Sequence, residues 1–295
     1  MIRTQGLTQR FGNNYALHNV DIHVQKRSIY GLLGSNGAGK TTFLSLVAGL
    51  QHPTYGTIYY DGHSMSTMDK RKLGLMPQHA GFPREEKVFA YLRYIAGLRG
   101  LSPAKAHREV LGFLEDLGMD YRMDAKFGTL SNGMLKLINI AQAFIAGPEV
   151  ILLDEPMAGL DPKVSVRVLR FLRENKKGRT YVICSHHLSV IEDLCTHVGI
   201  LHKGYLMIQS PVAKLRDISH VINLRVDRTP KRFVEKLRLL RGVKNVLVDE
   251  SSHSIRIQHS HDVLPPLMEI LKDQKIQLLS LARGERLNDF FLKYL

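Results

Sequence analysis

The feature that most constrains this chain is a glycine-rich segment that follows a short apolar run and precedes a helical stretch. The segment fits the spacing G-x-x-x-x-G-K-[ST], in which glycines let backbone N–H groups turn inward on a chain of phosphates. Such a loop needs a strand before it and a helix after it, so the chain must contain a strand–loop–helix unit. The residues expected to bind nucleotide here are Gly34, Ser35, Asn36, Gly37, Ala38, Gly39, Lys40, Thr41 and Thr42.

Two side chains of this loop have defined roles in the pattern. Lys40 reaches the β- and γ-phosphates and takes part in catalysis, and the Thr41 hydroxyl takes one position around Mg²⁺. The helix that follows adds the positive end of its dipole. A glycine-rich turn without a ligand is the alternative, and it is disfavoured because so many fixed positions match together. The segment therefore predicts binding of ATP with Mg²⁺.

An acidic pair is the second element that indicates chemistry. Residues 150–153 form an apolar run that ends in Asp154 and Glu155. Successive side chains of a strand diverge, so the two carboxylates can serve different roles. Asp154 is expected to bind Mg²⁺, and Glu155 to orient the attacking water or take a proton from it as a catalytic residue. An acidic turn after a strand is the alternative, and the phosphate loop elsewhere in the chain disfavours it.

The pattern of apolar runs divides the chain into two parts. Over residues 2–215, short apolar strands alternate with helical stretches, which predicts a largely parallel sheet. From residue 221 the order changes to strand, helix, two strands, helix and strand, and a last helix is expected over residues 286–295. We therefore expect an α/β domain over residues 1–217 and a small α+β domain of βαββαβ, ferredoxin-like type over residues 220–295.

Charge and cysteine content limit the surroundings of the protein. Lys and Arg total 41 against 27 Asp and Glu, a net charge of +14, so the surface can attract nucleic acid, anionic lipid or nucleotide, or simply be solvated. Two cysteines, Cys184 and Cys195, imply no disulfide framework and fit a reducing cytoplasm. No apolar run approaches the roughly 18 residues that span a bilayer. A membrane process would therefore need another chain to supply the membrane path.

Several further motifs lie in a recognisable order around the phosphate loop and the acidic pair. They are Phe11, Gln78 after the strand expected over residues 73–76, the run Leu130-Ser131-Asn132-Gly133-Met134, the run Ala158-Gly159-Leu160-Asp161, and His186 after Ser185. In this order the motifs resemble those of the ATP-binding cassette (ABC) ATPases, and the resemblance covers residues 1 to about 215. It implies a P-loop NTPase fold with a mostly parallel sheet core, an antiparallel β subdomain and a helical subdomain inserted at about residues 79–148.

The resemblance also implies roles for individual residues. Phe11 would stack on the adenine, and Gln78 would contact Mg²⁺ and the attacking water. His186, rather than His187, would contact the γ-phosphate as a catalytic residue, because the family places this histidine directly after a small residue.

Other family positions act between two copies of the cassette. Ser131 and Gly133 would touch the γ-phosphate held by a second, facing subunit, and Asp161 would connect the two sites. Two residues depart from the usual signature Leu-Ser-Gly-Gly-Gln. Asn132 tolerates left-handed backbone and would keep the loop shape, whereas Met134 lacks the amide for a polar contact.

The altered signature and the C-terminal segment resemble those of one branch of the family. The pattern Leu-Ser-x-Gly-Met and the segment Leu287-Asn288-Asp289-Phe290-Phe291-Leu292 resemble cassettes of ABC-2 type exporters. The implied protein is a transport motor on the cytoplasmic face of the cell membrane, with Mg²⁺ as cofactor. Its partners would be a membrane-spanning permease subunit and a second cassette, identical or different.

Three aromatic side chains and a histidine pair are further candidates for contacts. In the family, the segment after Gln78 receives a helix of the membrane subunit, so the resemblance implies Phe82, Phe89 and Tyr91 as candidates for contact with the permease; one helical face of this segment is expected to pack in the core. His259 and His261 could bind a metal, and a surface pair is the favoured alternative.

Two other functions are alternatives to the transport motor. A cassette acting on nucleic acid or ribosomes would suit the +14 charge, but this chain has one cassette and no sustained heptads, so nucleic acid is not expected as a partner. A regulatory subunit that does not hydrolyse ATP is disfavoured because Lys40 and Glu155 are both present.

Overall fold

The computed structural model describes residues 1–64, 67–216, 221–260 and 263–283. The chain divides into two compact units, Met1–Ser210 and Pro211–Leu295. This division lies a few residues before the linker that the sequence predicts after residue 217. The short helix α7 (Val212–Arg216) follows it.

A six-stranded sheet forms the centre of the first unit, in the order β11-β10-β4-β9-β8-β7. The pairings from β10 through β7 are parallel. Strands β4, β8 and β9 are buried at every residue, as their near-continuous apolar runs require. The bounds are β4 (Ile29–Leu33), β7 (Leu73–Met76), β8 (Val150–Asp154), β9 (Thr180–Ser185), β10 (His197–His202) and β11 (Tyr205–Pro211).

An antiparallel sheet shares its core with the parallel one through helix α1 (Lys40–Val47). Its strands run in the order β2-β1-β5-β6, and β3 also pairs with β1. Buried side chains of α1, among them Phe43 and Leu44, lie in one hydrophobic core with residues of both sheets. The bounds are β1 (Ile2–Phe11), β2 (Asn14–Val20), β3 (His23–Val24), β5 (Tyr55–Tyr60) and β6 (His63–Ser64).

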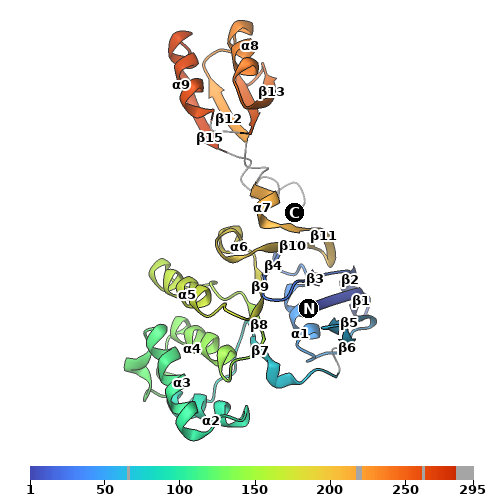
Figure 1. The fold of residues 1–295 in the computed structure, drawn as a ribbon, viewed down its shortest axis with the longest axis vertical. Helices are drawn as coiled ribbons and strands as arrows, with labels where there is room; N and C mark the ends of the chain where they lie inside the picture. Colours follow the sequence, from blue (N-terminus) through green and yellow to red (C-terminus); the bar gives the residue numbers. More distant parts are fainter. Residues whose placement is uncertain (65–66, 217–220, 261–262, 284–295) are drawn as a thin grey trace. The chain divides into compact units, whose positions relative to one another are not determined.

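A group of helices is inserted between β7 and β8 and lies apart from the antiparallel sheet in Figure 1. It comprises α2 (Val88–Leu98), α3 (Pro103–Asp116) and α4 (Asn132–Phe144), and α4 packs on β7 and β8. Phe82 stacks on Phe127 with ring centroids 4.5 Å apart, and Tyr91 meets Phe127 edge to face. Two further helices, α5 (Pro162–Glu174) and α6 (Leu188–Leu194), follow β8 and β9. The predicted parallel core, antiparallel subdomain and helical subdomain are thus confirmed.

The second unit has the predicted βαββαβ order. Its four-stranded antiparallel sheet runs β13-β14-β12-β15, with α8 and α9 packed on one face. Phe233 of α8 and Leu267 of α9 are fully buried against this face. The bounds are β12 (Val221–Val226), α8 (Lys231–Leu239), β13 (Val243–Asp249), β14 (Ser254–His259), α9 (Leu264–Asp273) and β15 (Leu278–Arg283).

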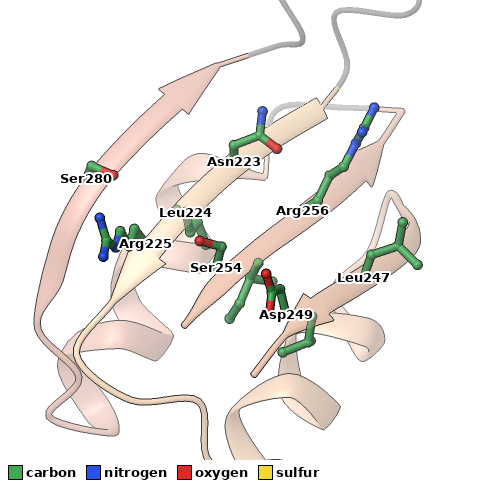
Figure 2. A pocket seen from close by; sticks show the side chains of 10 residues that line it. Asn223, Leu224, Arg225, Leu247, Asp249, Ser254, Arg256 and Ser280 are labelled. Carbon is green, nitrogen blue, oxygen red and sulfur yellow. The ribbon is translucent and has the colours of Figure 1, made fainter. Parts of the chain in front are cut away.

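The opposite face of this sheet carries a shallow pocket of about 340 Å³ (Figure 2). Period-two alternation along β12 places Leu224 in the core and Asn223 and Arg225 on the pocket side. Leu247, which is 58% exposed, lies on the same side. The expected helix over residues 286–295, with its Leu287 to Leu292 motif, and His261 lie outside the described residues.

Replacement of Phe144 by Ala tests the packing of α4 against the sheet. Phe144 is 0% exposed, and its ring lies 4.9 Å from that of Phe171 and 5.8 Å from that of Tyr181. We expect Phe144→Ala to lower the free energy of unfolding by about 3–5 kcal/mol, measured by urea unfolding and circular dichroism. Tyr94→Ala is the control, because Tyr94 is 63% exposed. Equal losses for the two variants would contradict this account of the core.

Candidate functional site

The glycine-rich loop between β4 and α1 needs glycine at specific points. Gly37 and Gly39 have φ angles of 81° and 106°, in the region that side chains rarely adopt. A Cβ atom at Gly39 would also collide with the main-chain oxygen of Ala16, and one at Gly34 with that of Leu201. The loop is therefore enclosed by neighbouring backbone, and α1 starts directly after it at Lys40.

Parallel pairing places the other site residues at the same edge of the sheet. Leu33 lies opposite Ser185, Asp154 opposite Cys184, and Met76 opposite Leu153. The residues that follow these strand ends must therefore meet beyond one sheet edge, where open α/β sheets bind ligands. A pocket of about 260 Å³ forms there, lined by Ala16, Asn36, Gly37, Gly39, Lys40, Thr41, Thr42, Gln78 and Glu155.

Asp154 and Thr41 form the part of the site suited to a divalent cation. The Thr41 hydroxyl donates to Oδ2 of Asp154 at 2.6 Å, and Asp154 is only 2% exposed. Burial raises the pKa of the Asp154 carboxyl above its usual range, although the Thr41 hydrogen bond and Lys40 oppose this. Oδ1 of Asp154 is buried and has no hydrogen-bond partner among the described residues. A buried carboxylate oxygen without a hydrogen-bond partner is suited to coordinate a cation.

The Glu155 carboxylate lies between the side chains of Lys40 and His186. Its Oε1 atom is 3.4 Å from Nζ of Lys40 and 2.9 Å from Nδ1 of His186. Lys40 is itself nearly buried, and its ammonium also donates to Gly34 O at 2.8 Å and Ser35 O at 3.1 Å. Neither carboxylate oxygen of Glu155 has a hydrogen bond of good geometry to the part of the chain that the structure describes. Attraction to the Lys40 ammonium thus holds the carboxylate in place. Its oxygens can still accept a hydrogen bond from water.

Glu155 has an unusual backbone conformation, and its main chain contacts Lys136, a residue that the sequence does not indicate as part of the site. Glu155 has a φ angle of 50°, in the left-handed region that non-glycine residues rarely occupy. Lys136 of α4 donates to the main-chain oxygens of Glu155 at 3.0 Å and Ala158 at 2.5 Å. No motif in the sequence indicates this contact, because it joins segments 19 and 22 residues apart.

The remaining predicted residues lie at different places. Phe11 ends β1 and is 51% exposed, and it lies outside the lining of the phosphate-loop pocket. Gln78 lines that pocket and also a second one of about 510 Å³. Gly133 and Leu160 line only the second pocket of these two. Ser131, the N-cap of α4, accepts a hydrogen bond from Met134 N.

One expectation about the signature is wrong. Asn132 was expected to use a left-handed backbone, but it is the first residue of helix α4 and is absent from the residues with positive φ in the described chain. Gly133 also lies within this helix. The segment therefore needs no left-handed residue, because the N-cap at Ser131 starts the helix directly.

Comparisons with known proteins relate the first unit to one family. Residues 17–158 match the family model described as ABC transporter. The bacitracin transport ATP-binding protein BcrA of Bacillus licheniformis is 35% identical over 221 residues, covering 73% of this chain and 71% of the relative. The linearmycin resistance ATP-binding protein LnrL of Bacillus subtilis (strain 168) is 28% identical over 294 residues, covering 97% of this chain and 94% of the relative.

Solved structures agree with the architecture described above. The structure of an ATP-binding subunit of an ABC transporter has a TM-score of 0.68 and 27% identity, and the match covers 73% of this chain and 92% of that one. The dimeric post-hydrolysis state of the cassette MJ0796 bound to ADP and Pi has a TM-score of 0.67 at 22% identity, covering 72% and 99%. The latter likeness concerns the fold alone.

Replacement of Gly39 by Ala tests the shape of the loop. The added Cβ atom would collide with the main-chain oxygen of Ala16, and alanine would have to adopt the unfavourable φ angle of Gly39. The loop must therefore deform. We expect the dissociation constant for Mg-ATP, measured by calorimetry, to rise at least about tenfold. Gly178→Ala is a matched control, because Gly178 has a φ of 77° but open space where its Cβ would lie. A similar rise in both variants would show that this enclosure of the loop is unimportant.

Proposed function

The chain belongs to the ATP-binding proteins of ABC transporters, and on that basis we propose that it is the ATP-hydrolysing motor subunit of an exporter. The observation that carries the proposal is the meeting of Lys40, Asp154, Glu155 and Gln78 beyond one edge of the parallel sheet. This arrangement provides a phosphate cradle, a carboxylate for a cation and a second carboxylate for water. The motor site is assigned to the first unit.

Within the proposed site, Mg²⁺ would be bound by Asp154, Thr41 and Gln78. The unpartnered buried Oδ1 of Asp154 and its Thr41 partner fit such an ion, since oxygen ligands are those that Mg²⁺ prefers. When bound with ATP, the ion supplies neutralisation of charge on the β- and γ-phosphates.

Glu155 and its neighbours are proposed to act on the attacking water. The carboxylate orients this water and accepts its proton, because its oxygens keep their acceptor capacity. Lys40 binds the phosphates, and His186, whose ring is 36% exposed beside Glu155, contacts the γ-phosphate. The near-complete burial of Lys40 and Glu155 strengthens these charge interactions.

A second cassette is proposed to complete each site. Ser131 and Gly133 start helix α4, and Gly133 lines the second pocket with Leu160 instead of the phosphate-loop pocket of its own chain. These residues would therefore serve the nucleotide of a facing subunit, identical or different. ATP binding would then favour the closed pair of cassettes, and hydrolysis would reopen it.

A membrane-spanning permease is proposed as the other partner. Among the described residues, no helix combines the length and apolar character needed to cross a bilayer. We propose that a separate subunit provides the transport path and holds this chain at the cytoplasmic face of the cell membrane. Export is supported by the bacitracin-transport and linearmycin-resistance relatives, and neither favours the alternative of action on nucleic acid or ribosomes.

Replacement of Glu155 by Gln tests the proposed chemistry. The amide keeps the shape of the side chain but cannot accept the proton of water, so turnover should fall by at least about 100-fold. Binding of Mg-ATP, measured by calorimetry, should persist because Lys40 and the loop are unchanged. Glu174→Gln on α5 is the control, because the Glu174 side chain is exposed and forms an ion pair with Arg170 on the surface of that helix. Turnover of Glu155→Gln at the wild-type rate would refute the assigned role.

Replacement of Phe11 by Ala tests the proposed stacking on adenine. Loss of stacking worth on the order of 1 kcal/mol should raise the KM for ATP about fivefold and leave kcat nearly unchanged. Phe11→Tyr keeps an aromatic ring and serves as the control in the same steady-state assay. An unchanged KM in the alanine variant would remove Phe11 from the nucleotide site.

A further inference from the structure

Lys136 has no role in the proposed chemistry, but its side chain contacts the main chain beside Glu155. It lies one turn into α4, and its side chain is partly buried. Its ammonium donates to the main-chain oxygens of Glu155 at 3.0 Å and Ala158 at 2.5 Å. Surface lysines usually point to water or pair with carboxylates. This one instead bridges two carbonyls of a turn that is 19 residues or more away in sequence.

The turn that Lys136 contacts is the one that carries Glu155. Ala158 N donates to Glu155 O at 3.2 Å, so the turn spans four residues, and Lys136 joins the carbonyls at its first and last positions. On the other side, Glu155 N donates to Cys184 O of β9 at 3.0 Å. The Glu155 backbone is thus fixed from the sheet on one side and from α4 on the other.

This fixation matters because the conformation of Glu155 is unfavourable by itself. A φ angle of 50° for a glutamate persists only where the surroundings determine it. The position of the carboxylate, between Lys40 and His186, depends on that backbone. Without the Lys136 contact, the turn could relax and move the carboxylate away from both groups.

We propose that Lys136 is a positioning residue for ATP hydrolysis, which holds the turn that aims Glu155 into the phosphate-loop pocket. The inference rests on the proposed role of Glu155. Because α4 also begins with the signature residues Ser131 and Gly133, Lys136 joins the start of that helix to the turn. If binding of a second cassette moved α4, the two hydrogen bonds of Lys136 would therefore move the turn that carries Glu155.

The test compares substitutions of Lys136 that keep or remove the cation. Lys136→Met keeps the length of the side chain and removes its donors, whereas Lys136→Arg keeps a cation with several donors. We expect kcat for ATP hydrolysis to fall roughly tenfold or more in Lys136→Met, because small misplacement of a reacting group is costly. KM should stay within about twofold, since the loop that binds ATP is untouched. Lys136→Arg should recover most of the turnover.

Lys105→Met on α3 provides the matched control, because Lys105 is exposed in the same helical group. Thermal unfolding of each variant shows whether it is folded. If Lys136→Met does not fold, Lys136→Gln replaces it and the same fall in kcat is expected. Wild-type turnover in the folded variant would overturn the proposal. A loss that Lys136→Arg does not recover, with KM raised as much as kcat is lowered, would overturn it as well.

Glu155→Gln, measured in the same assay, separates this inference from the function it rests on. If Glu155→Gln keeps full turnover, the role of Glu155 fails and the positioning role of Lys136 fails with it. If Glu155→Gln is inactive and Lys136→Met is fully active, only the proposal for Lys136 fails. Reduced turnover in both, with recovery by Lys136→Arg, supports both.

Discussion

Parallel pairing of buried strands is the constraint on which the rest of this structure depends. The strands β7, β8, β9 and β4 run in the same direction and in aligned register, so their carboxyl ends finish together. Each end is followed by a different group: Gln78, the acidic pair, His186 or the phosphate loop. The burial of β4, β8 and β9 at every residue places these strands in the middle of the sheet, where side chains on both faces are packed. One hydrophobic arrangement therefore assembles four chemical elements.

The assembled site concentrates charge in a poorly hydrated place. Lys40, Asp154 and Glu155 are all nearly buried, and several carboxylate oxygens lack hydrogen bonds within the described part of the chain. Burial of charge is costly unless partners compensate it. Here the Lys40 ammonium, 3.4 Å away, compensates Glu155 in part, and the Thr41 hydrogen bond compensates Asp154 in part. A nucleotide and its cation would complete the compensation, so the proposed ligand and the electrostatics of the site agree.

Backbone geometry shapes the proposed nucleotide site as much as the side chains do. The loop is closed by glycines whose Cβ atoms would meet neighbouring carbonyls, and the Glu155 turn is held in a left-handed conformation. Lys136 connects that turn to α4, whose first residues are proposed to face another cassette. Binding between cassettes and positioning of the proposed catalytic carboxylate thereby involve the same helix. The second unit contributes a separate sheet, whose pocket is lined by Arg225 and Arg256.

The local elements of this structure follow from short stretches of the sequence. The spacing of glycines with Lys40 and Thr41, the apolar run before Asp154, and the order of strands in the tail each depend on near neighbours, so they could be predicted. The resemblance already favours His186 over His187, but its contact with Glu155, at 2.9 Å, depends on the pairing of β8 with β9. Asn132 was misjudged because the start of α4 at Ser131 gives it helical backbone. Lys136 gave no signal, since its partners are main-chain oxygens that any residue could supply. Contacts of that kind depend on how a helix packs against a distant turn, and tertiary structure alone decides them.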